Sequence, residues 1–185
     1  MAGTEVLMAG FGGQGMLASG KLLAYAAMDR GMEVSWLPSY GPEMRGGTAN
    51  VTVCISDCPV GSPYIAKPSA LLVMNQPSLD KFGPRVKPGG LIVVNSSLVS
   101  APSDRKDCTV ISIPANDLAT QVGTARAANL VMLGVYVGWS GVVDKATTIR
   151  MIEKEFAKKA KFIPANLAAF KIGFAEGVKA KGGKR

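Results

Sequence analysis

The sequence predicts an α/β fold of three layers, α/β/α and Rossmann-like, with a mixed but mostly parallel sheet and a helical C-terminal third. Short apolar runs such as residues 70–74 (ALLVM) and 91–94 (LIVV) are typical of strands buried on both faces, as in parallel sheets. These runs alternate with stretches of helical periodicity, which is the pattern of α/β domains. From residue 125 onward the apolar spacing is helical.

The first elements surround two glycine-rich segments. Residues 4–9 (TEVLMA) form an apolar run that predicts a buried strand, and residues 16–29 have the broad apolar face of a helix. A second strand is expected over residues 33–37 (EVSWL). Residues 38–47 (PSYGPEMRGG) contain two prolines and three glycines, so we expect a loop there.

The middle of the chain is expected to complete the sheet. Residues 48–55 (TANVTVCI) are β-branched and partly alternating, which predicts a strand with one exposed face or a strand at an edge. Residues 56–69 contain three prolines and form a long connection. Further strands are expected at residues 70–74, 91–94 and 109–113, and short helices at residues 77–82 and 115–121.

The C-terminal third is expected to pack on the sheet as helices. Residues 125–136 are small and apolar and predict a buried helix. Asp144 is a typical N-cap residue, so a second helix is expected from there to about residue 160. A last helix is expected over residues 165–178.

The net charge of +8 is unevenly distributed. Half of it comes from the last seven residues, which contain Lys179, Lys181, Lys184 and Arg185. We therefore expect one domain over residues 1–178 and a basic, disordered tail over 179–185. Nucleic-acid binding is not expected, because aromatic residues make up only 6% of the chain and do not alternate with the basic ones.

Membrane and metal sites are not expected either. The chain has no apolar run of 18 residues and no signal-peptide pattern at its start, which predicts a cytoplasmic protein. It has no histidine and three cysteines: Cys54, Cys58 and Cys108. Three thiols at this spacing do not make a structural zinc site or hold an iron–sulfur cluster, so we expect buried, apolar cysteines and no metal.

The first candidate site is the turn after the first strand. Residues 10–15 (GFGGQG) fit the G-x-G-x-x-G pattern between a strand and a helix, where backbone N–H groups attract phosphate. The acidic residue that binds the ribose of NAD is absent from the end of the second strand, so ordinary NAD binding is not expected. Anion binding and a purely structural tight turn both remain open. The candidate residues are Gly10, Gly12, Gly13, Gln14 and Gly15.

The second candidate site is the loop after the second strand. If the first two strands run in the same direction, this loop lies at the same sheet edge as the glycine turn, where ligands of α/β proteins bind. Arg45 can present its guanidinium to a phosphate or carboxylate, or can pair with Glu43 and order the loop. A subunit contact is a further alternative. The candidate residues are Ser39, Tyr40, Arg45, Gly46 and Gly47.

Together the two loops resemble a known family. GFGGQG followed by PSYGPEMRGGTANVTVCIS is similar to the gamma subunit of 2-oxoacid:ferredoxin oxidoreductases. The resemblance continues through LLVMNQPSL, KPGGLIVVNSSLV and the helix with Arg126 to Asn129, and covers roughly residues 4–177. The motif SYGPEMRGG, and the presence of a short separate chain, are most similar to the 2-oxoglutarate type.

The resemblance implies a subunit that is not catalytic alone. Such enzymes decarboxylate a 2-oxoacid on thiamine diphosphate, reduce ferredoxin through iron–sulfur clusters and form an acyl-CoA. The thiamine diphosphate and the clusters lie on alpha, beta and, in some enzymes, delta subunits, which would be the partners of this chain.

The resemblance also implies a role in receiving coenzyme A. Under it, the glycine turn would contact the pyrophosphate of CoA, Arg45 with Ser39 and Tyr40 would contact a phosphate or line the channel, and Lys21 is a weaker candidate. The alternatives are a free-standing nucleotide-binding protein, an indolepyruvate-type subunit and a purely structural assembly subunit.

Overall fold

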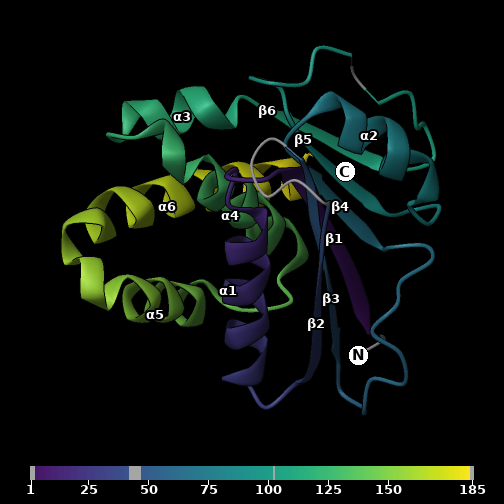
Figure 1. The fold of residues 1–185 in the computed structure, drawn as a ribbon, viewed down its shortest axis with the longest axis horizontal. Coiled ribbons are helices and arrows are strands. Elements are labelled where there is room, and N and C mark those ends of the chain that lie inside the picture. The colour runs from purple at the N-terminus through teal and green to yellow at the C-terminus, as the bar shows by residue number, and fades with distance from the viewer. Residues whose placement is uncertain (1–2, 42–46, 102, 184–185) are drawn as a thin grey trace.

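The computed structural model describes residues 3–41, 47–101 and 103–183 and contains a mixed six-stranded sheet in the order β2-β3-β1-β4-β5-β6 (Figure 1). The strands are β1 (Thr4–Phe11), β2 (Glu33–Tyr40), β3 (Thr48–Ser56), β4 (Ala70–Val73), β5 (Leu91–Asn95) and β6 (Thr109–Ile113). The pairs β1–β4, β4–β5 and β5–β6 are parallel, whereas β3 is antiparallel to both β1 and β2. The prediction of a mixed, mostly parallel sheet is confirmed.

The β2–β3 hairpin explains why the sheet is mixed. The connection between these strands is too short for the crossover that a parallel pair requires, so β3 returns antiparallel. The expected end of the second strand at residue 37 was wrong, because β2 continues to Tyr40. The Gly41 N–H donates to the Thr48 carbonyl at 2.8 Å, which makes Pro38 and Val51 a non-hydrogen-bonded pair. The backbone nitrogen of Pro38, which carries no hydrogen, therefore points away from β3 at the sheet edge. Proline is tolerated at such a position because no hydrogen bond of the sheet is lost.

Helices cover both faces of the sheet, as the three-layer prediction requires (Figure 1). Along β1, Val6 and Met8 face one core, and Leu7 and Ala9 face the other. The first core is the larger. It is covered by α1 (Met16–Met28), α3 (Ala115–Gln121), α4 (Ala128–Ser140), α5 (Lys145–Phe156) and α6 (Ile163–Gly182). The second face is covered by α2 (Gln76–Phe82) and the 3-10 turn Gly83–Arg85.

Helices α4 and α6 pack unusually closely because glycines interlock at their contact. A Cβ added at Gly173 would collide with the Val131 carbonyl oxygen and lie 2.8 Å from its carbonyl carbon. A Cβ at Gly134 would lie 2.7 Å from the Phe174 nitrogen. The two helix backbones therefore touch directly, and no larger residue fits between them.

The C-terminal helices differ from the expectation at their ends. Asp144 caps α5 as predicted, and its Oδ1 accepts the Thr147 N–H at 2.7 Å. However, α5 ends at Phe156 and a 3-10 segment, Ala157–Phe162, follows, because Lys159 leaves the helical conformation at φ −135°.

Helix α6 extends beyond its expected end at residue 178. It continues to Gly182, so the part of the expected disordered tail over residues 179–182 is helical. Lys179 and Lys181 lie in the last turn of this helix, where cations interact favourably with its dipole.

Candidate functional site

The glycine turn lies at the carboxyl end of β1 and is held by the side chain of Gln14. The Phe11 N–H donates to Gln14 Oε1 at 2.6 Å, and Gln14 Nε2 donates to the Met74 carbonyl at 3.3 Å, beyond β4. The Gln14 N–H donates back to the Phe11 carbonyl at 3.1 Å. Gln14 therefore ties the turn after β1 to the end of the neighbouring strand, and its side chain has a structural role.

Two of the glycines are required by this packing. A Cβ at Gly10 would collide with Gln14 Oε1 and lie 3.0 Å from Met74 Cβ. Gly15 has φ +78°, and a Cβ there would lie 2.8 Å from Asn129 Nδ2. The G-x-G-x-x-G pattern is thus explained at its ends by close packing and by a left-handed conformation.

Asn129 fixes the start of α1 against α4. Its Nδ2 donates to the Gly15 carbonyl at 3.1 Å and to Ser19 Oγ at 3.0 Å, and Ser19 Oγ donates to the Asn129 carbonyl at 3.1 Å. Asn129 is a buried polar residue in a largely apolar helix. Both partners lie within the chain, so Asn129 orders the turn.

The second candidate loop reaches the glycine turn, as the shared-edge prediction required. The Gly12 N–H donates to the Gly47 carbonyl at 2.9 Å, so the two loops meet directly. Arg45 and Gly46 lie outside the described residues.

Ser39 and Tyr40 lie at the same edge but do not form one cluster with the turn. They are level with Ala9 and Gly10 but two strands away, about 10 Å at ordinary strand spacing. Because successive strand residues point to opposite faces, Ser39 and Tyr40 face opposite sides of the sheet. Tyr40 is 61% exposed.

Two backbone donors of the turn remain available. Among the described residues, none accepts a hydrogen bond from the N–H of Gly13 or Gly15. Helix α1 begins directly afterwards, with no side-chain cap and no acidic residue in its first turn. By contrast, the Gly12 N–H is already bound by Gly47. The turn can therefore offer Gly13, Gly15 and the positive end of α1 to an anion.

A row of asparagines at the same edge was missed by the sequence analysis. Asn75 caps α2, while its Nδ2 is buried and finds no acceptor among the described residues. Asn95 accepts the Ala115 N–H at 3.1 Å and donates to Asn116 at 2.7 Å. The signal was present, since Asn75 and Asn95 each follow a buried apolar run. Asn75 leaves a buried donor that a ligand or water can satisfy.

The groups with shifted pKa values lie away from this edge. Burial raises the pKa of Tyr136 to about 12, and its hydroxyl lies 3.3 Å from Thr4 Oγ1 at the opposite edge. The Thr147 N–H lowers the pKa of Asp144 at the start of α5. Burial raises the pKa of the Cys108 thiol. The glycine edge is thus built from amides and backbone groups, which suits binding and positioning.

The described ranges contain neither a metal-binding cluster nor a membrane-spanning helix. Within them, no group of three or more His, Cys, Asp or Glu side chains is placed to hold a metal ion. None of the helices described is both long and apolar enough to cross a membrane. The three cysteines are free. Cys54 is buried as expected, but the expectation of buried thiols is wrong for Cys58, which is exposed, and for Cys108, which is partly exposed.

Comparison with known proteins identifies the family. The family model for pyruvate ferredoxin/flavodoxin oxidoreductase matches residues 5–176. The chain belongs to this family. It is 44% identical over 171 residues to the ketoisovalerate oxidoreductase subunit VorA of Methanothermobacter thermautotrophicus, covering 91% of this chain and 35% of VorA. The chain thus spans about a third of the length of that relative.

Other members of the oxidoreductase family match over nearly all of their length. The 2-oxoglutarate synthase subunit KorC of Methanocaldococcus jannaschii is 34% identical over 173 residues, which is 92% of this chain and 91% of KorC. The crystal structure of a keto/oxoacid ferredoxin oxidoreductase gamma subunit from Geobacter sulfurreducens superposes with a TM-score of 0.82 and 31% identity, covering 95% and 99% of the two chains. The resemblance drawn from the loop motifs is confirmed.

Proposed function

We propose that this chain is the gamma-type subunit of a 2-oxoacid:ferredoxin oxidoreductase complex. In such a complex a 2-oxoacid is decarboxylated oxidatively, ferredoxin is reduced and an acyl-CoA is formed. The observation that carries the proposal is the family match over residues 5–176, together with a glycine turn and a second loop that meet at one sheet edge. KorC and the Geobacter gamma subunit support a separate chain of this size.

The partner subunits hold the redox and thiamine chemistry in this proposal. Thiamine diphosphate, when bound there, supplies the carbanion chemistry of the reaction. The described part of this chain offers no acidic cluster for the metal ion that accompanies a diphosphate and no set of thiols for an iron–sulfur cluster. The role of this chain is then to bind and orient the acyl acceptor beside the thiamine.

Coenzyme A is the ligand proposed for the glycine turn. Its phosphates require N–H donors and positive potential, and Gly13, Gly15 and the first turn of α1 offer both. Gly12 contributes indirectly, because its N–H holds the second loop in place through Gly47. Arg45 and Gly46 belong to that loop, and we propose Arg45 as the cation that approaches a phosphate.

Two substrates are favoured by different observations. The higher identity to VorA favours a branched-chain 2-oxoacid such as 2-oxoisovalerate. The full-length match to KorC, and the SYGPEMRGG motif of the second loop, favour 2-oxoglutarate. We propose that the substrate is a 2-oxoacid, and an activity assay with both compounds distinguishes 2-oxoisovalerate from 2-oxoglutarate.

The test is anaerobic co-expression of this chain with candidate alpha, beta and delta subunits from the same organism. The purified complex is assayed for viologen reduction with 2-oxoisovalerate, 2-oxoglutarate, pyruvate and indolepyruvate, each with and without CoA. We expect a complex containing thiamine and iron–sulfur subunits and CoA-dependent reduction with one preferred oxoacid. A chain that stays solitary, binds NAD or ATP tightly and supports no reduction would establish the free-standing nucleotide-binding alternative.

A further inference from the structure

The excess positive charge lies almost entirely in the C-terminal segment of the chain, residues 141–185. Residues 141–185 contain 11 of the 21 Lys and Arg but only 4 of the 13 Asp and Glu, so this segment carries +7 of the net +8. The sheet and its connections, residues 1–140, are nearly neutral. A surface with a concentrated positive charge favours binding to a partner surface with a negative charge.

Four of these lysines form one basic segment at the end of α5 and in the 3-10 turn after it. The basic segment consists of Lys154, Lys158, Lys159 and Lys161. Among the described residues, none of the four has an ion-pair partner, whereas Lys21 and Arg150 nearby are paired with Glu155 and Asp29. The positive charge of the segment is therefore free to attract an external carboxylate.

The 3-10 segment Ala157–Phe162 contains no buried residue. Phe162 leaves 43% of its surface exposed, and Lys161 Nζ lies over its ring at 5.2 Å from the centroid. Lys159 interrupts the helical conformation in the middle of the turn. A segment with no buried residue and a partly exposed aromatic ring contributes little to the core of the isolated chain, which favours a contact with a partner.

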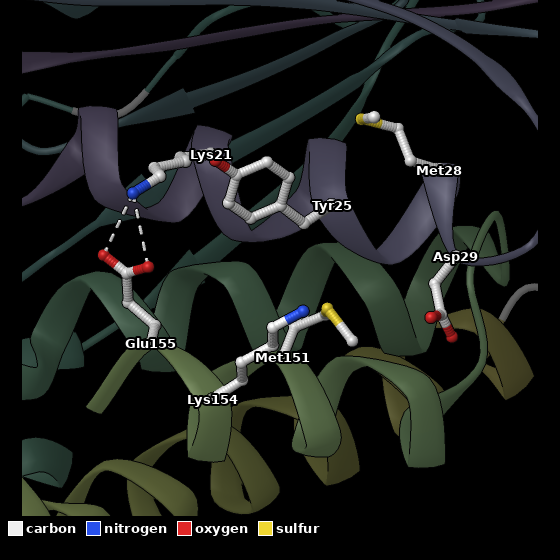
Figure 2. A pocket seen from close by; sticks show the side chains of 7 residues that line it. All are labelled: Lys21, Tyr25, Met28, Asp29, Met151, Lys154 and Glu155. Carbon is white, nitrogen blue, oxygen red and sulfur yellow. Dashed lines mark hydrogen bonds and ion pairs between the residues drawn. The ribbon is translucent and has the colours of Figure 1, made fainter. Parts of the chain in front are cut away.

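A groove lined by both charged and apolar side chains lies beside the basic segment, between α1 and α5. This α1–α5 groove has a volume of about 510 Å³ (Figure 2). Its lining includes Tyr25, 44% exposed, and Met28, 56% exposed, with Met151 across from them on α5 (Figure 2). Methionine side chains are flexible and adapt to an inserted apolar group, so this lining suits a protein side chain.

The groove and the basic segment form one continuous surface. Lys154 belongs to both, because it lines the groove and starts the run of unpaired lysines. The Lys21–Glu155 ion pair, 3.3 Å long, closes one end of the groove, and Asp29 lies at the other (Figure 2). The surface therefore combines a depression, lined in part by Tyr25, Met28 and Met151, with an adjacent positive charge.

We propose that this surface docks an acidic segment of a partner subunit, which places an apolar side chain in the α1–α5 groove and carboxylates against the basic segment. The inference rests on the proposed function, because that function supplies the partner. A second copy of this chain is disfavoured, since it would bring its own +7 against the same charge. A nucleic acid is disfavoured because it would place no apolar side chain against Met28 and Met151 in the groove.

The test uses the co-expressed complex and reverses charges that no fold contact needs. The variant Lys158→Glu/Lys159→Glu/Lys161→Glu alters only exposed side chains. The matched control, Lys67→Glu/Lys81→Glu/Lys106→Glu, makes the same charge change at exposed positions outside the C-terminal helices. Dissociation of this subunit is measured against NaCl concentration by size-exclusion chromatography and by binding of the labelled subunit to the remaining complex.

We expect the basic-segment variant to bind its partners at least tenfold more weakly at low salt and to lose most of the salt dependence, with the control unchanged. A second variant, Tyr25→Ala/Met28→Ala, is expected to weaken binding while keeping the salt dependence. Hydrogen exchange should slow over residues 154–162 on assembly.

The outcomes separate the inference from the proposed function. A complex that assembles and reduces viologen with both triple variants equal in affinity, and with residues 154–162 unprotected, would overturn the docking surface and leave the function intact. Failure of the unaltered chain to assemble with these subunits would overturn both. Nucleic acid could instead co-purify with the unaltered chain and be lost only in the basic-segment variant. This result would overturn the proposal of an acidic protein segment, because the surface would then bind nucleic acid.

Discussion

Glycine serves two different purposes in two regions of this molecule. At the α4–α6 contact, glycines such as Gly134 and Gly173 have ordinary helical conformations and are required by the neighbouring backbone. In the turn after β1, Gly13 and Gly15 have φ values of +97° and +78° and leave their N–H groups without an acceptor in the described chain.

This difference distinguishes glycines that are needed for helix packing from glycines that are available for ligand binding. In the helix pair a methyl group has no space, so the glycines there contribute to stability and say nothing about a ligand. In the turn a methyl group at Gly13 meets nothing within 4 Å, so space is not the constraint and the backbone conformation is. The two regions should therefore respond differently to the same Gly→Ala substitution.

The largest effect is expected for Gly173→Ala. The new Cβ would collide with the Val131 carbonyl, and both backbones are held in helices, so α4 and α6 must separate. We expect the free energy of unfolding to fall by about 3 kcal/mol, or roughly 10 °C in Tm, measured by urea and thermal unfolding.

Gly182→Ala is the control for this substitution on the same helix. Nothing lies within 4 Å of a Cβ at Gly182, so alanine there should be neutral or stabilise the helix by up to about 1 kcal/mol. Equal effects at Gly173 and Gly182 would mean that helix propensity decides and that the close α4–α6 packing does not hold in solution.

A smaller loss is expected for Gly15→Ala. This position combines a left-handed conformation with contact to the Asn129 side chain, so we expect a loss of about 2.5 kcal/mol. Gly31→Ala is the matched control, because Gly31 has φ +73° and nothing within 4 Å. The free energy of unfolding of Gly31→Ala should fall by only about 1 kcal/mol, which is the cost of placing alanine in a left-handed conformation. The difference measures the contact with Asn129.

Asn129→Ala tests that contact from the other side. The variant removes two hydrogen bonds, to Gly15 and Ser19, and we expect a loss of about 1.5 kcal/mol. In this background Gly15→Ala should cost no more than Gly31→Ala, since the obstructing amide is gone. Additive losses in the double variant, measured by urea unfolding, would show that Asn129 and Gly15 do not interact.

The layers of the fold were predictable from sequence because buried strands and helices have a characteristic local spacing of apolar residues. The runs ALLVM and LIVV became the buried strands β4 and β5, and Asp144 became the cap of α5. Strand β2 was underestimated because Pro38 signals a loop, whereas an edge strand tolerates a proline whose missing N–H faces outward. That exception depends on the pairing with β3, which is not a local property.

The site was predictable only in part. The glycine turn and its proximity to the second loop followed from strand direction, and the Gly12–Gly47 hydrogen bond confirms the shared edge. The use of Gly12 and Gln14 for internal contacts could not be foreseen, because it depends on the exact approach of Gly47 and Met74. Motif spacing indicates which donors exist, and only the tertiary structure shows which remain free.

The smallest effect on stability, and the sharpest test of function, is expected for Gly13→Ala. Gly13 has φ +97° and open space around it, so we expect a loss of about 1 kcal/mol and an unchanged complex. Because alanine disfavours the conformation that aims the Gly13 N–H, the KM for CoA should rise several-fold while the KM for the oxoacid stays constant. Gly123→Ala, with φ +111° and equally open space, is the control and should leave both KM values unchanged. Since the two substitutions carry the same backbone strain, a KM for CoA that responds equally to both, or to neither, would place CoA away from the glycine turn.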